Sequence, residues 1–162
     1  MELLELRNGQ IVTLDLMFAL TIIFSVILVI NSQWGIMLNN INNYETKISM
    51  EKAAHTATLY LINGQGYPAN WNSSNVQLIG LVNDLNVISP IKLNSLMKID
   101  NTTLGESLGI PEFKVFINLT TTGGTTIRST GLLPVNYSGS AIVKSFVSYN
   151  NSLSNLYVTV WK

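Results

Sequence analysis

Asp15 is the residue of this sequence whose position most requires a chemical explanation. It is the one charged residue among the twenty from Ile11 to Ile30, a segment dominated by Leu, Ile, Val and Phe. A carboxylate inside an apolar segment is costly in a bilayer, and such groups are normally paired or functional. Two roles fit its place near the start of the segment. It is paired with an opposite charge, or it lies at the lipid headgroups and favours the positive end of a helix.

Residues suited to catalysis or metal binding are scarce. His55 is the only histidine and the chain has no cysteine, so disulfides and thiolate metal sites are excluded. The sequence also lacks the H-x-x-x-H, P-loop and G-x-S-x-G patterns of common metal, phosphate and nucleophile sites. Since no acid pair frames it, His55 is interpreted as a structural residue. We therefore expect no enzyme activity, no cofactor and no bound metal.

Five Asn-x-Ser/Thr sequons are candidate sites of N-glycosylation. About three would arise by chance in a chain this rich in Asn, Ser and Thr, and all five follow the apolar segment. Asn72, Asn101 and Asn136 fall in expected loops, Asn118 in mid-strand, and Asn150 at an expected hairpin turn. Asn118 is expected on the outward face of its strand, where it can still reach solvent.

Glycosylation of these sequons is tested by the mass of the mature protein. We expect glycan mass on the exported chain, first at the loop asparagines, because the transfer of a glycan needs an accessible side chain. A mature protein whose mass equals that of its polypeptide would contradict this hypothesis.

The overall composition limits the class of protein. The chain has 162 residues, of which 47% are hydrophobic and only 11% are charged, and its formal net charge is zero. A typical soluble domain is about 25% charged. Lys and Arg are scattered along the sequence, whereas nucleic-acid binding needs a concentrated basic surface. We therefore expect no nucleic-acid partner and room for one modest domain beside the apolar segment.

The apolar segment itself matches a membrane-spanning helix. Twenty helical residues rise about 30 Å, which is the thickness of the hydrocarbon core. A cleaved secretory peptide has a shorter apolar core and a small-x-small site behind it, whereas Ile30 is followed by Asn-Ser-Gln-Trp. Trp34 suits an interfacial anchor beyond the span. A buried core helix is disfavoured, because the rest of the chain is too small to enclose it.

The junction before the segment resembles the class III signal peptides of archaeal type IV pilin-like proteins. Its features are the short charged leader, Gly9-Gln10, the acid at Asp15 and an unbroken apolar helix. The resemblance implies that a prepilin-type peptidase cuts between Gly9 and Gln10 on the cytoplasmic side. Residues 1–9 are then the leader, residues 10–30 the retained helix, and Gln10 the new N-terminus. A glycine at the cut suits a protease, which needs an open backbone there.

The resemblance also gives Asp15 a role in assembly. Counted from Gln10, Asp15 is the sixth residue, whereas bacterial pilins place a Glu at the fifth. In a filament, the free amine of Gln10 on one subunit can pair with Asp15 on a neighbour, which neutralises both charges in an apolar core. The alternative is the headgroup position at the helix N-terminus. Other pilin-like subunits, the membrane and the peptidase are the implied partners.

The helix is expected to continue beyond the membrane to about Ile62. Apolar residues recur at helical spacing through 31–63, while the residues between them are rich in Asn and then charged, which predicts an amphipathic continuation. Gly64 and Gly66 are expected to end the helix, and Pro68 prevents its resumption. Beyond it, Tyr67 and Trp71 are aromatic residues that suit a sugar, although packing against the helix is the stronger interpretation.

Residues 64–162 are expected to form a head of short helices and an antiparallel sheet. Ser89-Pro90 starts a helix whose apolar face combines Ile91, Leu93, Leu96, Met97 and Ile99, and Thr103–Glu106 forms a capping box for a second helix. Gly109 and Pro111 end that second helix. A short strand is expected within 76–82. Four strands are expected at 113–119, 125–130, 141–149 and 153–161, with turns at Gly123-Gly124 and Asn150-Asn151.

The expected fold is therefore α+β, with a long N-terminal helix whose second half packs on a C-terminal head with about four strands. Type IV pilins are similar to this arrangement. Two functions fit. The first is a structural, pilin-like subunit, minor rather than major, of an archaeal type IV pilus-like surface filament. The second is a processed single-pass surface protein whose extracellular head binds a ligand and does not polymerise. Both place the protein in the cell membrane with its head outside.

Overall fold

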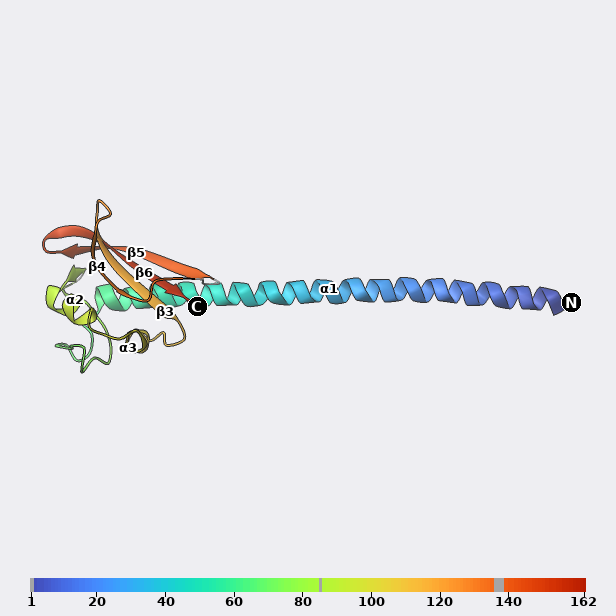
Figure 1. Ribbon diagram of the computed structural model, residues 1–162, viewed down its shortest axis with the longest axis horizontal. Coiled ribbons are helices and arrows are strands. Elements are labelled where there is room, and N and C mark those ends of the chain that lie inside the picture. Colours follow the sequence, from blue (N-terminus) through green and yellow to red (C-terminus); the bar gives the residue numbers. More distant parts are fainter. Residues whose placement is uncertain (1, 85, 136–138) are drawn as a thin grey trace. The chain divides into compact units, whose positions relative to one another are not determined.

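The computed structural model describes the backbone of residues 2–84, 86–135 and 139–162, and the side chains from Thr13 onward. Along the chain, helix α1 is followed by the strands of one sheet and by short helices (Figure 1). The chain divides into two compact units, residues 1–44 and residues 45–162. We call the second unit the head. The coarse expectation of an α+β chain with a long N-terminal helix and a C-terminal sheet is confirmed.

Helix α1 runs from Glu2 to Asn63. It ends where expected, because Gly64 donates its N–H to the carbonyl of Tyr60 and Gly66 takes a φ of +78°. A side chain is disfavoured at that backbone conformation, which glycine adopts at little cost. The two glycines therefore turn the chain out of the helix and into the loop that starts the head.

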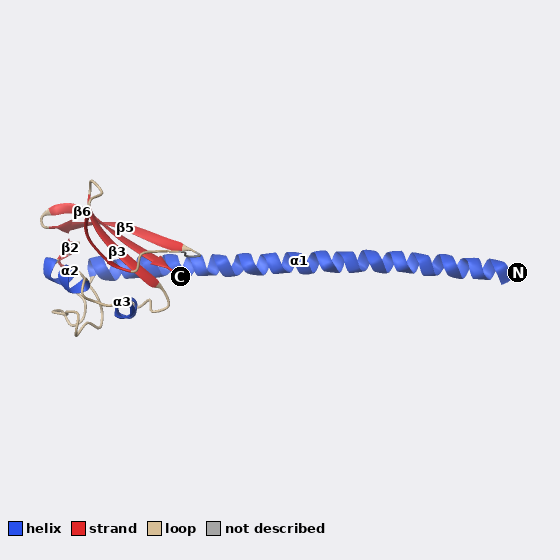
Figure 2. Ribbon diagram, in the orientation of Figure 1, coloured by secondary structure: helices blue, strands red, loops and turns tan. Residues whose placement is uncertain are grey.

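The head contains one sheet of six strands, shown in Figure 2, in the order β1-β2-β5-β6-β3-β4. The four longer strands are β3 (Lys114–Thr121), β4 (Thr126–Gly131), β5 (Ser140–Tyr149) and β6 (Ser152–Trp161). These four were expected from the sequence, and both of their hairpins are confirmed. Asn150 and Asn151 have φ of 49° and 59°, the left-handed conformations that a tight two-residue hairpin needs.

The expected strand count of about four is wrong, because two short strands extend the sheet beyond β5. They are β1 (Val82–Asp84) and β2 (Val87–Ile88). The pairing of β2 with β5 is parallel, while every other pair of neighbouring strands is antiparallel. Most of the strand expected within 76–82 is irregular instead, with a single bridge between Tyr67 and Leu78. Strands of two or three residues are too short to show the alternation on which the expectation relied.

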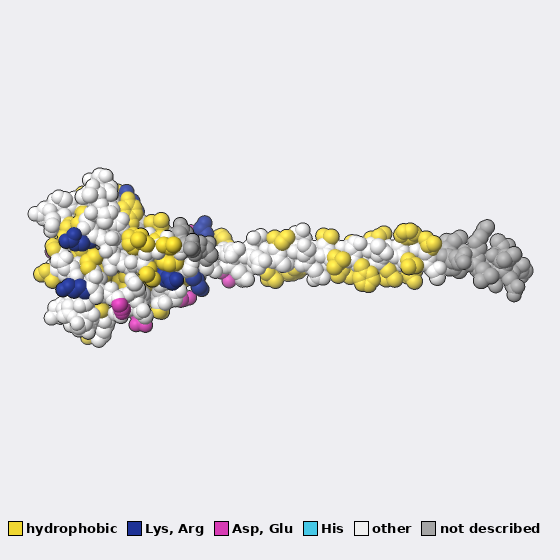
Figure 3. Space-filling model, in the orientation of Figure 1, with side chains coloured by type: hydrophobic (Ala, Val, Ile, Leu, Met, Phe, Trp, Pro, Cys, Tyr) yellow, Lys and Arg dark blue, Asp and Glu magenta, His cyan; other side chains and the backbone are white. Residues whose placement is uncertain are grey.

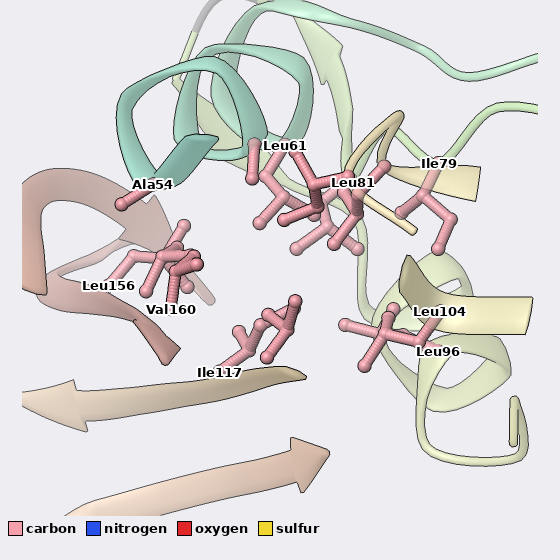
Figure 4. Packing of buried hydrophobic residues seen from close by; sticks show 14 of the residues in the cluster. Ala54, Leu61, Ile79, Leu81, Leu96, Leu104, Ile117, Leu156 and Val160 are labelled. Atoms are coloured by element: carbon pink, nitrogen blue, oxygen red, sulfur yellow. The ribbon is translucent and has the colours of Figure 1, made fainter. Parts of the chain in front are cut away.

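The last turns of α1 cover one face of the sheet, which we call the inner face. Its inward residues alternate along β3 and β6, as in Ile117, Leu156 and Val160, all at most 1% exposed. Figure 4 shows these side chains directed toward Ala54 and Leu61 of α1. Alanines at 53, 54 and 57 are buried at the same contact. Small side chains at this contact leave room for the larger inward residues of the sheet.

Helix α2 (Pro90–Leu96) has Ser89 at its N-cap and proline in its first turn, as the sequence indicates. Its buried face is rotated from the expected one. Ile91 is 79% exposed, and Lys92 takes its place inside the head beside Leu93 and Leu96. Ile91 and Lys92 are adjacent in sequence, and a helix separates neighbours by about 100°. The rotation therefore exchanges an apolar residue for a charged one.

Helix α3 (Asn101–Ser107) begins earlier than expected. Its N-cap is Asp100, whose carboxylate accepts hydrogen bonds from the Thr103 N–H at 2.9 Å and the Thr103 hydroxyl at 2.8 Å. The capping box expected to start at Thr103 is therefore wrong, because that residue donates to the cap instead of forming it. These bonds hold the pKa of Asp100 below its usual value, since they stabilise the ionised carboxylate.

The contact between α1 and the sheet gives a prediction about stability. Leu61 is fully buried and Leu59, two residues earlier on the same helix, is 42% exposed. We expect Leu61→Ala to lower the free energy of unfolding of the head by about 2–5 kcal/mol, because it leaves a cavity. Leu59→Ala, the control, should change it by less than about 0.5 kcal/mol. Urea unfolding followed by near-ultraviolet circular dichroism in micelles measures both, and equal losses would contradict the packing described above.

Candidate functional site

The most extensive candidate site is the exposed surface of α1 from Thr13 to Tyr44. The helix contains a segment long and apolar enough to cross a membrane by length and composition, and none of that segment is buried. Large apolar side chains such as Met17, Phe18 and Leu28 are 63–69% exposed. Figure 3 shows apolar side chains along this part of α1. A soluble monomer rarely exposes an apolar surface of this kind, so the segment needs lipid or other helices around it.

Two hydroxyl side chains within this segment have hydrogen bonds to the backbone of the same helix. The Thr21 hydroxyl donates to the carbonyl of Met17 at 2.8 Å, and the Ser25 hydroxyl donates to the carbonyl of Thr21 at 2.7 Å. Bonds to the carbonyl four residues earlier satisfy a hydroxyl without water. The two hydroxyls therefore add little cost to the insertion of the segment into a bilayer.

Asp15 lies on the exposed surface of α1. The backbone at Gly9 and Gln10 is helical, and the side chain of Gln10 lies outside the described residues. A protease that cuts this peptide bond must unwind the helix locally. Gly9 lowers the cost of that step, since glycine favours a helix less than other residues except proline.

Three sequon asparagines lie at accessible places on the head. Asn72 is exposed in a loop, where its side-chain oxygen accepts the N–H of Ser74 at 2.8 Å. Asn101 is the exposed first residue of α3 and does not lie in a loop as expected, and Asn150 is exposed in the β5–β6 turn. All three have the exposure that a glycan needs. Asn136 lies outside the described residues.

Asn118 lies in the middle of the sheet. Its strand β3 pairs with β4 on one side and with β6 on the other, opposite Ser129 and Tyr157. The side chain is half-exposed, while its Oδ1 atom is buried without a hydrogen-bond partner. A glycan at this position would cover the face of the sheet that points away from α1.

The other residues considered for chemistry are apart from one another. His55 is exposed on α1, and among the described residues no group of three His, Cys, Asp or Glu could hold a metal ion. Trp71 is buried in the core and its indole N–H donates to the carbonyl of Gly80 at 2.9 Å. The burial of Trp71 agrees with the packing interpretation. For Tyr67, which was expected to pack in the same way, that interpretation is wrong, because its side chain is 62% exposed.

Lys92 is a buried charged residue that the sequence does not reveal. Its ammonium donates to the carbonyls of Gln65 at 2.8 Å and Val82 at 3.0 Å. Burial lowers the pKa of Lys92 below its ordinary value, because a charged amine loses hydration there. The two bonds join the loop after α1, the start of β1 and α2. Lys92 therefore fixes three segments of the head that lack a common strand or helix.

The outer face of the sheet, which points away from α1, holds three polar atoms without partners. They are Asn118 Oδ1, Thr120 Oγ1 and Asn155 Oδ1, each buried and without a hydrogen bond among the described residues. Thr120 and Asn155 face each other across β3 and β6, and Asn118 lies two residues from Thr120 on the same side of β3. We call these three side chains the polar trio. Most buried polar groups in proteins are hydrogen-bonded, so such a group needs an explanation.

Aromatic and cationic side chains border the polar trio. Phe146 of β5 lies opposite Asn155, and Tyr157 of β6 lies opposite Asn118. The Lys144 ammonium lies 5.1 Å from the centre of the Phe146 ring and 5.7 Å from that of Tyr157, within the range of cation–π attraction. Phe146 is 60% exposed. This cluster was not expected, because its members are far apart in sequence.

Comparisons with known proteins add no relative to this description. No protein-family model, no curated protein and no solved structure matches the chain.

Proposed function

We propose that the chain is a pilin-like structural subunit, minor rather than major, of an archaeal type IV pilus-like surface filament. The observation that carries the proposal is the fully exposed apolar surface of α1 from Thr13 to Tyr44. Such a surface requires lipid before assembly and neighbouring helices after it. The resemblance of the leader, Gly9-Gln10 and Asp15 to a class III signal peptide supports the same proposal.

Two parts of α1 have different surroundings, which supports this proposal. Residues of the helix enter the core of the head only from Met50 onward, so the apolar residues before Tyr44 stay available for other contacts. Trp34, Met37 and Leu38 are 55–59% exposed, although the sequence suggested an amphipathic helix from residue 31. In the proposed filament, these residues lie against the helices of neighbouring subunits together with the membrane-spanning part.

A second candidate function is a processed single-pass surface protein with a binding head that does not polymerise. The polar trio beside exposed Phe146 favours it, because unpartnered polar groups beside an aromatic ring are typical of ligand sites. Both candidates place the head outside the cell. Co-sedimentation of the protein with sheared surface filaments separates them. Its presence in filaments supports the structural subunit, while a processed protein confined to the membrane supports the binding head.

The first prediction of this proposal concerns processing. In a host with a prepilin-type peptidase, we expect the mature chain to begin at Gln10, so that intact mass and N-terminal sequencing both show the loss of residues 1–9. Gly9→Val should leave the leader attached, because a β-branched residue hinders the open backbone required at the cut. Gly35→Val, the matched control in the same helix, should be processed normally. A mature chain that begins at Met1, or after residue 30, would contradict the proposal.

The second prediction concerns Asp15. We expect Asp15→Ala and Asp15→Asn to reduce the amount of subunit in sheared filaments by more than about tenfold, since loss of one partner from a buried ion pair costs about 3–5 kcal/mol. The amount in the membrane should not change. Asp84→Asn, which alters an exposed carboxylate of the head, is the control. Normal assembly by both Asp15 variants would reject the pairing and leave the role at the headgroups.

A further inference from the structure

We propose that the outer face of the sheet is a saccharide-binding site in which the polar trio and the exposed ring of Phe146 recognise a sugar. The site consists of Asn118, Thr120 and Asn155 with Phe146 and Tyr157 beside them. This inference goes beyond the proposed function, because binding of a sugar by the head does not require filament assembly.

The polar trio is a group of neighbours on one surface. Thr120 and Asn155 are paired residues of adjacent strands, which lie about 4.8 Å apart. Asn118 is two residues along β3, about 7 Å away. Thr120 and Asn155 are each 5% exposed. Three residues with an unpartnered oxygen therefore lie on neighbouring positions of the outer face, within the span of a small oligosaccharide.

Within the described part of the fold, the three oxygens of the polar trio have no hydrogen-bond partner, which points to a partner outside the fold. Each unpaired buried oxygen has lost its bond to water and gained none in return. A valine in place of Thr120 would have the same shape without an unsatisfied hydroxyl. A polar side chain that an apolar one could replace without loss of stability is most readily explained by a binding partner. Such a partner would donate the hydrogen bonds that the three oxygens lack.

The position of the polar trio excludes recognition through the backbone. Strand β3 lies between β6 and β4, and β6 lies between β5 and β3. The backbone groups of both strands are therefore used within the sheet, and a peptide cannot add to it as a further strand here. Any ligand must be recognised by side chains alone. Surface recognition by amide, hydroxyl and aromatic side chains suits a sugar.

The chemistry of the surrounding side chains also favours a neutral, hydroxyl-rich ligand. The trio presents oxygens that need donors, and sugar hydroxyls supply donors in adjacent positions. Phe146 offers an exposed ring for the apolar face of a sugar. Lys144 lies over the rings of Phe146 and Tyr157, so it opposes a cationic ligand. It can also turn its ammonium toward a sugar oxygen.

Access to the oxygens needs only side-chain movement. The three atoms are buried in the free protein, and the large side chains near them on the outer face include Phe116, Phe146 and Tyr157. Exposed side chains change rotamer within nanoseconds, so a sugar that stacks on Phe146 can displace its neighbours and reach the polar trio. No backbone rearrangement is required.

The experiment measures sugar binding to the full chain. The protein is made in a bacterial host without N-glycosylation, so that Asn118 carries no glycan, and is placed in phosphatidylcholine nanodiscs. Saturation-transfer NMR is recorded with maltotetraose, cellotetraose, chitotetraose and mannotetraose at millimolar concentration. We expect transfer to at least one tetrasaccharide, with a dissociation constant that a titration defines. Absence of transfer to all four overturns the proposal and leaves an ordered water as the partner of the polar trio.

Matched variants test whether the outer face is the site. We expect Thr120→Val and Phe146→Ala each to raise the dissociation constant by about tenfold, through loss of a hydrogen bond and of a stacking ring. Thr120→Ser, which keeps the hydroxyl, and Ile142→Ala, which alters another exposed residue of β5, should bind as the parent does. The melting temperature of Thr120→Val should be unchanged or higher. Unchanged affinity in both test variants overturns the proposal. A loss of affinity found only in variants whose melting temperature falls also overturns it.

The outcome is distinguishable from that of the proposed function. Binding without filament assembly supports the saccharide site and rejects the filament subunit. Assembly without binding supports the filament subunit and rejects the saccharide site. The two outcomes are independent, because the apolar surface of α1 and the outer face of the sheet share no residue.

Discussion

The close contact between the last turns of α1 and the inner face of the sheet is the interaction on which the head depends. The sheet has a continuous apolar face along β3 and β6, and a sheet face of that kind must be covered by another layer. The helix provides the cover through Ala53, Ala54 and Ala57, whose small side chains leave room for the larger inward residues of the sheet. Before Tyr44, the large apolar side chains of the same helix are exposed. One helix therefore combines an apolar face buried in the head with an exposed apolar segment that is long enough to cross a membrane.

The regular parts of this fold could be read from the sequence because their patterns are long. The alternation in β3 and β6 extends over eight and ten residues, and the Asn150-Asn151 turn has a strong local preference for its conformation. The end of α1 at Gly64 follows from the same kind of local preference. Strands β1 and β2 escaped the pattern because each has at most three residues. Asp100 and Thr103 both suit an N-cap, and only the fold decides which one caps α3.

The unexpected polar residues have a common origin in tertiary structure. Lys92 stands between Ile91 and Leu93 in a pattern that suggests a solvated lysine, but the loop after α1 brings the carbonyl of Gln65 to its ammonium. The polar trio joins Asn118 and Thr120 to Asn155, more than thirty residues away. No local pattern reports such neighbours, since the pairing of β3 with β6 creates them. By contrast, the apolar segment that contains Asp15 can be recognised in the sequence, because a membrane-spanning helix is identified by hydrophobicity and length alone.

The place of β6 within the sheet has a consequence for when the head can fold. This strand, Ser152–Trp161, lies between β5 and β3 and supplies Leu156, Val158 and Val160 to the core. The earlier strands, and the helix that packs on them, have no complete surface to fold against until it is in place. The head therefore cannot complete its core before β6 is available. Until then, the segments made earlier carry exposed apolar faces, which makes the partly formed head prone to aggregation.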